Sequence, residues 1–152
     1  MPTALEEKWK KEEEEKAAKE PTLDDVFRDD GSLDEETLEG SVREKLPRPT
    51  GWRILILPYR GATKTKGGIA LADQTMEKTQ MSTVCGYVLA VGDLAYGDMD
   101  KFPNGAWCQP GDWVIFARYA GSRLNIDGGE LRLMNDDEVL ARIEDPSTIL
   151  HM

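Results

Sequence analysis

The sequence predicts an all-β fold, a small β-barrel preceded by an acidic extension that is helical or partly disordered. Three observations lead to this prediction. From residue 50 onward, short runs of β-branched and aliphatic residues recur between turn signals. Residues 1–48 have a different composition, with 16 acidic and 9 basic side chains and few apolar ones. The prolines of "PRPT" at 47–50 block continuation of a helix, so we expect the extension over 1–48 and the β-domain over 49–152.

Within the extension, capping patterns predict two helical segments. Thr3 and Glu6 form a capping-box pattern at the start of the first segment, which Pro21 ends. Ser32 and Glu35 form the same pattern at the start of the second segment. That second segment carries an apolar residue at every fourth position: Leu38, Val42 and Leu46. The high charge leaves two interpretations open for the extension, a solvated and partly disordered arm or a docking or assembly arm.

In the β-domain, apolar runs and one hairpin signal predict the strands. The run "WRILILPY" is almost continuously apolar, which indicates a strand buried on both faces. Gly86 marks the expected position of a β-bulge in the second strand, and Asp127-Gly128-Gly129 predicts a hairpin between the fourth and fifth strands. In the last strand, Val139, Ala141 and Ile143 alternate on one face. The expected strands are "WRILILPY" (52–59), "TVCGYVLAVG" (83–92), "DWVIFARY" (112–119), "RLNI" (123–126), "ELRLM" (130–134) and "EVLARI" (138–143).

Two connections are longer than ordinary hairpin loops, and loops of that length are commonly functional or disordered. The first runs over about 60–82 and contains "KGGIAL". Gly67 and Gly68 allow the backbone to turn or to approach a partner closely, and Ile69 and Leu71 point the same way in an extended segment. An apolar segment between polar flanks suits docking into a groove of another protein. The spacing alone equally allows a short strand that belongs to the core of this domain.

The second long connection spans 93–111. It carries an Asn104-Gly105 pair between Phe102 and Trp107. Asn-Gly pairs favour the tight turns of β-hairpins, so the sequence predicts a protruding hairpin here.

The sequence offers no constellation for catalysis or metal binding. Cys85 and Cys108 form no CxxC pair, and the only histidine, His151, is the penultimate residue. No phosphate-binding glycine motif is present, and the acidic run at 136–138 is expected to form a turn. The net charge of −10 disfavours nucleic-acid binding, and no apolar run is long enough to span a membrane. We therefore expect neither an enzyme nor a metal-binding, nucleic-acid-binding or membrane protein.

Four motifs occur in a specific order along the β-domain. They are "GGIAL" after the first strand, "GYVLAVG" in the second, "PGDWVIF" in the third and "DGGELRLMNDDEVLARI" near the end. Together they resemble the chaperonin 10, or GroES, family of co-chaperonins over residues 50–143. Residues 1–48 and the tail "EDPSTILHM" have no counterpart in a typical member, and large aromatic residues stand where the family has its roof hairpin. Such additions are more typical of a virus-encoded or otherwise divergent member than of a bacterial housekeeping copy.

The resemblance implies a GroES-like barrel with a mobile loop and a roof hairpin, acting as a lid on a GroEL-type chaperonin. Members form a heptameric ring in which one mobile loop per subunit docks into the chaperonin, so the docking triplet here is Ile69, Ala70 and Leu71, with Gly67 and Gly68 shaping the loop. The lid closes a chamber in which an unfolded substrate protein folds. ATP is bound and hydrolysed by the chaperonin, so this chain needs no cofactor of its own. The implied ring contacts join the first strand of one subunit to the C-terminal strand of the next, and the implied location is the cytoplasm, or the host cytoplasm for a virus-encoded protein.

A second function from another class fits the same composition. A small β-barrel structural or assembly protein, such as a phage decoration factor, would act through its acidic arm. Capture of the chain by a chaperonin in the presence of nucleotide distinguishes the two functions.

Overall fold

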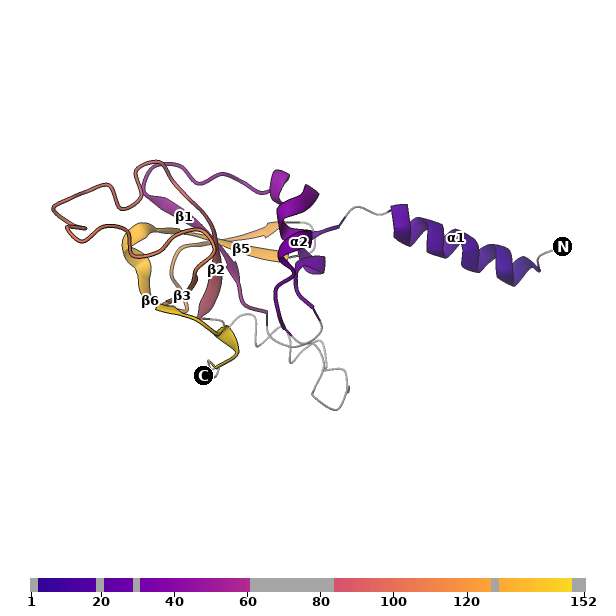
Figure 1. The fold of residues 1–152 in the computed structure, drawn as a ribbon. Helices are drawn as coiled ribbons and strands as arrows, with labels where there is room; N and C mark the ends of the chain where they lie inside the picture. Colours follow the sequence, from indigo (N-terminus) through magenta and orange to yellow (C-terminus); the bar gives the residue numbers. More distant parts are fainter. Residues whose placement is uncertain (1–2, 19–20, 29–30, 61–83, 127–128, 149–152) are drawn as a thin grey trace.

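The computed structural model describes residues 3–18, 21–28, 31–60, 84–126 and 129–148 (Figure 1). The helical elements are α1 (Ala4–Ala18), η1 (Leu23–Val26), α2 (Glu35–Thr37), η2 (Leu38–Val42), η3 (Asp136–Glu138) and η4 (Pro146–Thr148). The strands are β1 (Arg53–Pro58), β2 (Cys85–Val91), β3 (Trp113–Phe116), β4 (Ser122–Ile126), β5 (Gly129–Asn135) and β6 (Val139–Ile143). Each predicted strand is present, so the all-β class is confirmed. In the described parts of the chain, no helix is both long and apolar enough to cross a membrane.

The strands form one six-stranded antiparallel sheet in the order β4-β5-β1-β2-β3-β6. Strand β1 lies in the middle of this order, between β5 and β2. Strand β6 lies at one end and, among the described strands, pairs only with β3. The hairpin signal is confirmed, because β4 pairs with β5 up to Ile126 and Gly129. The acidic run at 136–138 forms the expected turn, as the 3-10 helix η3.

The bulge in β2 lies at Leu89, so its prediction at Gly86 is wrong. The register with β1 shifts between the pairs Leu55–Ala90 and Ile56–Val88, which leaves Leu89 as the extra residue. Gly86 instead pairs regularly with neighbours in both adjoining strands. A glycine is required at this position because the strands approach closely there: an added Cβ would lie 2.8 Å from the carbonyl oxygen of Leu57.

The long connection over 93–111 protrudes from the sheet (Figure 1), but it contains no strand, so the predicted hairpin is wrong. The amide of Phe102 donates to the carbonyl of Asp98 at 2.7 Å, and that of Gly105 donates to Phe102 at 3.1 Å. These bonds make local turns instead of a ladder. The ring of Phe102 is buried against Tyr96, with centroids 4.9 Å apart, and against Trp107, also at 4.9 Å. Burial of aromatic side chains therefore folds this loop onto the core.

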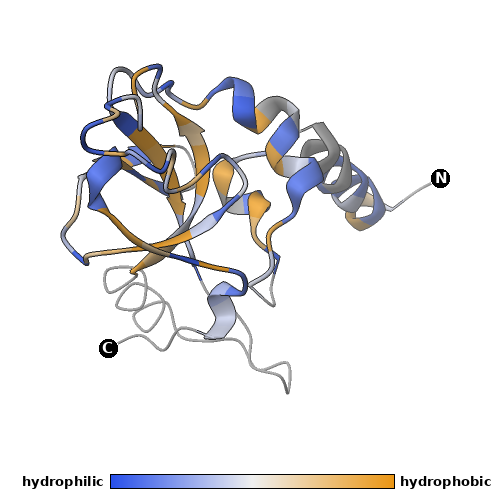
Figure 2. Cartoon of the chain, turned by 60° about the vertical axis from the view of Figure 1, so that its left-hand side comes forward, coloured by the Kyte–Doolittle hydropathy of each residue, from blue (hydrophilic) through white to orange (hydrophobic). Residues whose placement is uncertain are grey.

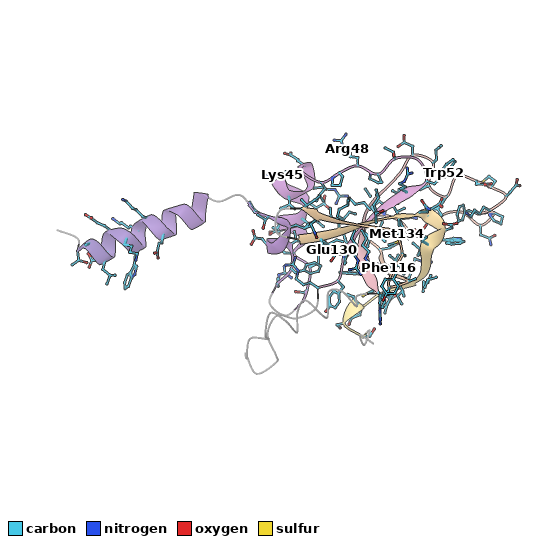
Figure 3. All side chains as sticks on the ribbon, turned by 180° about the vertical axis from the view of Figure 1, so that it is seen from behind. Lys45, Arg48, Trp52, Phe116, Glu130 and Met134 are labelled. Carbon is cyan, nitrogen blue, oxygen red and sulfur yellow. The ribbon has the colours of Figure 1, made fainter. Side chains whose placement is uncertain are left out.

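Two apolar clusters lie on the two sides of β1. The inner cluster contains residues of β1, β2, β3, β5 and β6, with Tyr96, Phe102 and Cys108 from the 93–111 loop. The outer cluster contains other residues of β1, β2 and β5 together with residues of the extension. Ile54 and Ile56 belong to the inner cluster and Leu55 and Leu57 to the outer one, which confirms a strand buried on both faces. Figure 2 shows the apolar residues along the strands and on the short helices beside them, and Figure 3 labels Phe116 and Met134 of the inner cluster.

The extension has two parts that differ in packing. Helix α1 begins with the predicted capping box, in which the Glu6 amide donates to Thr3 Oγ1 at 3.2 Å and the Thr3 amide donates to Glu6 Oε2 at 3.3 Å. Its apolar side chains Leu5 and Trp9 are exposed, at 55% and 58%. The part from 21 to 46 instead packs on the sheet through four buried side chains of the outer cluster: Leu23, Val26, Leu38 and Val42.

The second capping box, predicted at Ser32 and Glu35, is wrong. Asp34 caps α2, because its side chain accepts a 3.3 Å bond from the Thr37 amide and a 2.8 Å bond from the Thr37 hydroxyl. The same hydrogen bonds lower the pKa of Asp34, with a smaller contribution from the Arg28 charge. The apolar stripe at 38, 42 and 46 is confirmed as a packing face: two of its side chains are buried in the outer cluster and Leu46 packs against it.

Candidate functional site

The docking residues predicted from the sequence, Gly67, Gly68, Ile69, Ala70 and Leu71, lie outside the described residues. Their assignment stays a prediction. The structure describes the places where the 61–83 segment leaves and rejoins the sheet, which we call the stem. It consists of Tyr59 and Arg60 on the outgoing side and Val84 and Cys85 on the returning side.

Two hydrogen bonds hold the stem to the sheet. The Tyr59 amide donates to the Cys85 carbonyl at 2.9 Å, which joins the outgoing chain to the returning chain. The Phe116 amide donates to the Val84 carbonyl at 2.8 Å, which joins the returning chain to β3. The 61–83 segment therefore begins and ends at adjoining points of the sheet. Such a fixed pair of ends suits a binding loop presented by a rigid scaffold.

A row of aromatic rings runs beside the stem. Tyr59 packs edge-on against Trp113 of β3, with centroids 5.8 Å apart, and Trp113 packs against Tyr87 of β2 at 5.3 Å. On its other side Tyr59 meets Phe27 of the extension at 6.3 Å. The Arg60 guanidinium lies above the Phe27 ring, 5.7 Å from its centroid. Aromatic pairs in this geometry favour a defined orientation, so the row fixes the side chains where the segment leaves the sheet.

The stem has no group suited to covalent or acid–base chemistry at neutral pH. Burial raises the pKa of the Cys85 thiol to about 11, which keeps it protonated and unreactive. The pKa of Tyr87 is also raised, mainly by burial and then by the charges of Glu35 and Glu39 in the extension. Within the ranges that the structure describes, no group of three or more His, Cys, Asp or Glu side chains is arranged to hold a metal ion. The described stem is arranged for positioning and offers no reactive group.

A second candidate surface lies along β6, at the end of the sheet order. A groove of about 590 Å³ runs between this strand and the tip of the 93–111 loop. Leu140 and Trp107 line it and are 67% and 41% exposed. The outer edge of β6 carries backbone groups suited to pairing with another strand. In contrast, β1 pairs with both β5 and β2 within the subunit. The expected contact between the first strand and a neighbouring subunit stays a prediction.

The structure also identifies stem residues that sequence reasoning missed. Phe27 and Arg60 meet although they are far apart in the chain. No periodicity or motif marks this contact, because it depends on how the extension folds back on the sheet. The only sequence signal was the apolar stripe of the extension, which shows that the segment packs but does not show where.

Comparisons with known proteins agree with the extent of the sheet. The model of the family described as "Chaperonin 10 Kd subunit" matches residues 47–143, a region that includes all six strands. A protein named co-chaperonin GroES from Trichlorobacter lovleyi is 37% identical over 102 residues, covering 64% of this chain and 96% of that protein. A co-chaperonin GroES from Thermosipho melanesiensis is 36% identical over 98 residues, covering 64% and 97%. One from Caulobacter is 35% identical over 97 residues, covering 64% and 96%.

Proposed function

Because the chain belongs to the chaperonin 10 family, whose members are co-chaperonins and not enzymes, we propose that it caps a GroEL-type chaperonin and closes a chamber for ATP-dependent folding. The observation that carries this proposal is the family match over 47–143, which includes the whole sheet and the 61–83 segment with its "GGIAL" motif. The fixed stem supports it, because both ends of that segment are hydrogen-bonded to the sheet.

In this proposal Ile69 and Leu71 dock into an apolar groove of the chaperonin, Ala70 contributes less area, and Gly67 and Gly68 shape the backbone. Ordering a polar segment costs conformational entropy, so each segment binds weakly by itself. Several segments on one rigid ring make the later contacts intramolecular, and the whole lid then binds tightly but reversibly.

The ring is proposed to have seven subunits, as the family resemblance implies. The edge of β6 and the groove beside it are the proposed contact on one side of each subunit. Native mass spectrometry at micromolar concentration is expected to show one dominant closed oligomer of that size. A single monomer peak would contradict the ring.

The proposal also includes the partner chaperonin, the substrates and the cellular location. ATP is bound and hydrolysed by the chaperonin, so the chain needs no cofactor or metal of its own. Unfolded proteins inside the chamber are the substrates, neither nucleic acid nor a membrane takes part, and the cycle runs in the cytoplasm.

The test is capture of the full-length ring by a bacterial GroEL-type chaperonin with and without ATP, followed by electron microscopy of the complex. We expect capture of the parent protein only with nucleotide. Replacing Ile69 or Leu71 by Ser should greatly weaken capture, because each side chain loses about 1.5–3 kcal/mol of apolar burial in every bound subunit. Leu5→Ser is the matched control, since Leu5 is an exposed apolar residue of α1 away from the sheet.

The control variant should be captured like the parent, and all variants should keep the melting temperature and the ring. If Ile69→Ser lowers the melting temperature and disperses the ring, the triplet belongs to the core of this domain. If the parent itself is not captured, the function as an assembly protein acting through the acidic arm becomes the better explanation.

A further inference from the structure

The extension reaches the stem through η1 and the residue after it. Leu23 packs beside Gly129, at the start of β5, where an added Cβ would lie 2.8 Å from Leu23 Cδ2. The same Cβ would lie 3.1 Å from Arg60 Nη2, so Leu23, Gly129 and Arg60 meet in one small volume. Phe27 then contacts both outgoing stem residues, Tyr59 edge-on and Arg60 through the face of its ring. The extension therefore packs where the outgoing chain leaves the sheet.

Phe27 is itself held in place. It forms a β-bridge with Leu33, and two backbone bonds flank that bridge. The Asp34 amide donates to the Val26 carbonyl at 2.7 Å, and the Arg28 amide donates to the Ser32 carbonyl at 2.8 Å. Val26, the residue before Phe27, is fully buried in the outer cluster and anchors Phe27 beside the sheet. The ring of Phe27 is thus a fixed surface against which Arg60 can be oriented.

The matched family region begins at residue 47, so Phe27 lies outside it. The backbone bonds of the stem belong to the matched region and end at Tyr59 on the outgoing side. The contact between Phe27 and Arg60 restrains the next residue along the chain. A restraint at the exit of a binding segment reduces the conformational freedom that the segment loses on binding, and this raises its affinity.

We propose that Phe27, in contact with Arg60, is a positioning residue that sets the direction of the chaperonin-binding segment and strengthens its binding. The inference rests on the proposed function, because the affinity in question is that of the capping segment. Loss of a ring contact and a cation–π contact of this kind should weaken binding about two- to fivefold per segment. The effect should compound when several segments of one ring bind together.

The experiment compares full-length rings for two properties. The first is affinity for a bacterial GroEL-type chaperonin with ATP, and the second is amide exchange at Arg60 in the free ring. Phe27→Ala should lower the affinity and speed the exchange, Phe27→Tyr should restore both because it keeps the ring, and Arg60→Gln should act like Phe27→Ala. The loss of affinity in the double variant Phe27→Ala with Arg60→Gln should be smaller than the sum of the two single losses, because both single variants remove the contact between Phe27 and Arg60.

Leu46→Ala is the matched control. Leu46 also packs on the outer cluster, but it lies beside Ala90 and Val91, at the opposite end of β2 from Cys85. This variant loosens the extension without touching the stem, so its affinity and its exchange at Arg60 should match those of the parent. Equal losses in Leu46→Ala and Phe27→Ala would show a merely structural role and overturn the inference.

The outcomes separate the inference from the function on which it rests. A parent ring that binds the chaperonin, with Phe27→Ala and Arg60→Gln binding equally well, would overturn the inference and leave the proposed function standing. A parent ring that does not bind would overturn the proposed function and this inference with it. Should Phe27→Ala fail to fold, Arg60→Gln still decides, since it removes the guanidinium and leaves Phe27 and its buried neighbours in place.

Discussion

The two faces of β1 are buried by different parts of the chain. On the inner face, Ile54 and Ile56 pack against other strands and against the 93–111 loop, all within the matched family region. On the outer face, Leu55 and Leu57 pack against residues 23–42, which precede that region. In this chain, therefore, side chains of the extension and of the sheet together form the outer cluster. We infer that residues 21–46 form one packed unit with the sheet and that only the segment up to α1 is an arm.

Deletion of the extension should cause the largest loss of stability. Deleting residues 1–46 removes the four buried extension side chains of the outer cluster, each worth about 1.5–3 kcal/mol. Their sum is comparable to the whole stability of a domain of this size, about 5–15 kcal/mol. We expect the truncated chain to unfold at room temperature or to aggregate, as followed by urea unfolding and dye binding to exposed apolar surface.

Deleting only residues 1–19 is the matched control. Both Leu5 and Trp9 of α1 are exposed, so the shorter deletion should leave the urea midpoint within error of the parent. Equal unfolding midpoints for the two truncations would show that the outer face does not depend on the extension.

Removal of a polar contact on either face should change the free energy of unfolding by a smaller amount. Arg43 Nη2 donates to the carbonyl of Leu89, the bulge residue, at 2.6 Å, and Arg43 also pairs with Glu39 at 3.0 Å. On the other side of the sheet, Lys101 of the loop pairs with Asp137 at 2.6 Å, with both side chains largely exposed. Arg43→Ala should lower the free energy of unfolding by about 1–2 kcal/mol, because the bulge carbonyl loses a charge-assisted bond.

Lys101→Ala serves as the matched control, because exposed ion pairs contribute little to stability. Its midpoint in urea should equal that of the parent, although the pair with Asp137 raises the pKa of Lys101. Arg43→Lys should recover only part of the loss, since a lysine cannot serve both partners with the same planar geometry. A larger loss in Lys101→Ala than in Arg43→Ala would contradict the assigned roles.

The comparison also shows what the sequence could and could not predict. A continuous apolar run required burial of β1 on both faces, and a stripe of period four required that the second segment of the extension pack on something. Neither pattern shows which surface the segment packs against. The outer cluster and the contact of Phe27 with Arg60 could therefore be identified only from the tertiary structure. In the 93–111 loop, Asn-Gly indicated a hairpin, but burial of Phe102 in the inner cluster overrode the local signal.

Residues with two plausible local roles were the other source of error. Ser32 fits a capping box, yet Asp34 has the stronger acceptor and caps α2. Gly86 fits a bulge, yet it is required by the close approach of Leu57. For the docking triplet, spacing alone left the core and docking interpretations open, and only the resemblance favoured docking. The triplet lies outside the described residues, so its assignment stays a prediction.

The smallest expected effect distinguishes a buried cysteine of the 93–111 loop from a buried cysteine of a strand. Cys108 is buried in the inner cluster, where its Sγ lies 3.4 Å from the Tyr96 hydroxyl, whereas Cys85 is buried within β2. Burial raises the pKa of both thiols, so at pH 7.5 neither should react in the closed structure, and labelling must proceed through opening. A loop opens locally more easily than a central strand. In the parent, therefore, an alkylating reagent should modify Cys108 before Cys85, as measured by mass spectrometry of digested peptides.

The variant Trp107→Ala tests the same difference in labelling rate between Cys108 and Cys85. Its half-exposed ring packs on Phe102 and lies 6.0 Å from Tyr96, so its removal weakens the packing of the loop on the core. Aromatic pairs of this kind contribute about 0.5–1.5 kcal/mol, which corresponds to about two- to tenfold faster labelling of Cys108. The rate at Cys85 should stay that of the parent, because its exposure requires opening of the sheet. Equal acceleration at both cysteines would mean that the loop and the sheet open as one unit, and the inner face would then be no more locally mobile than the outer one.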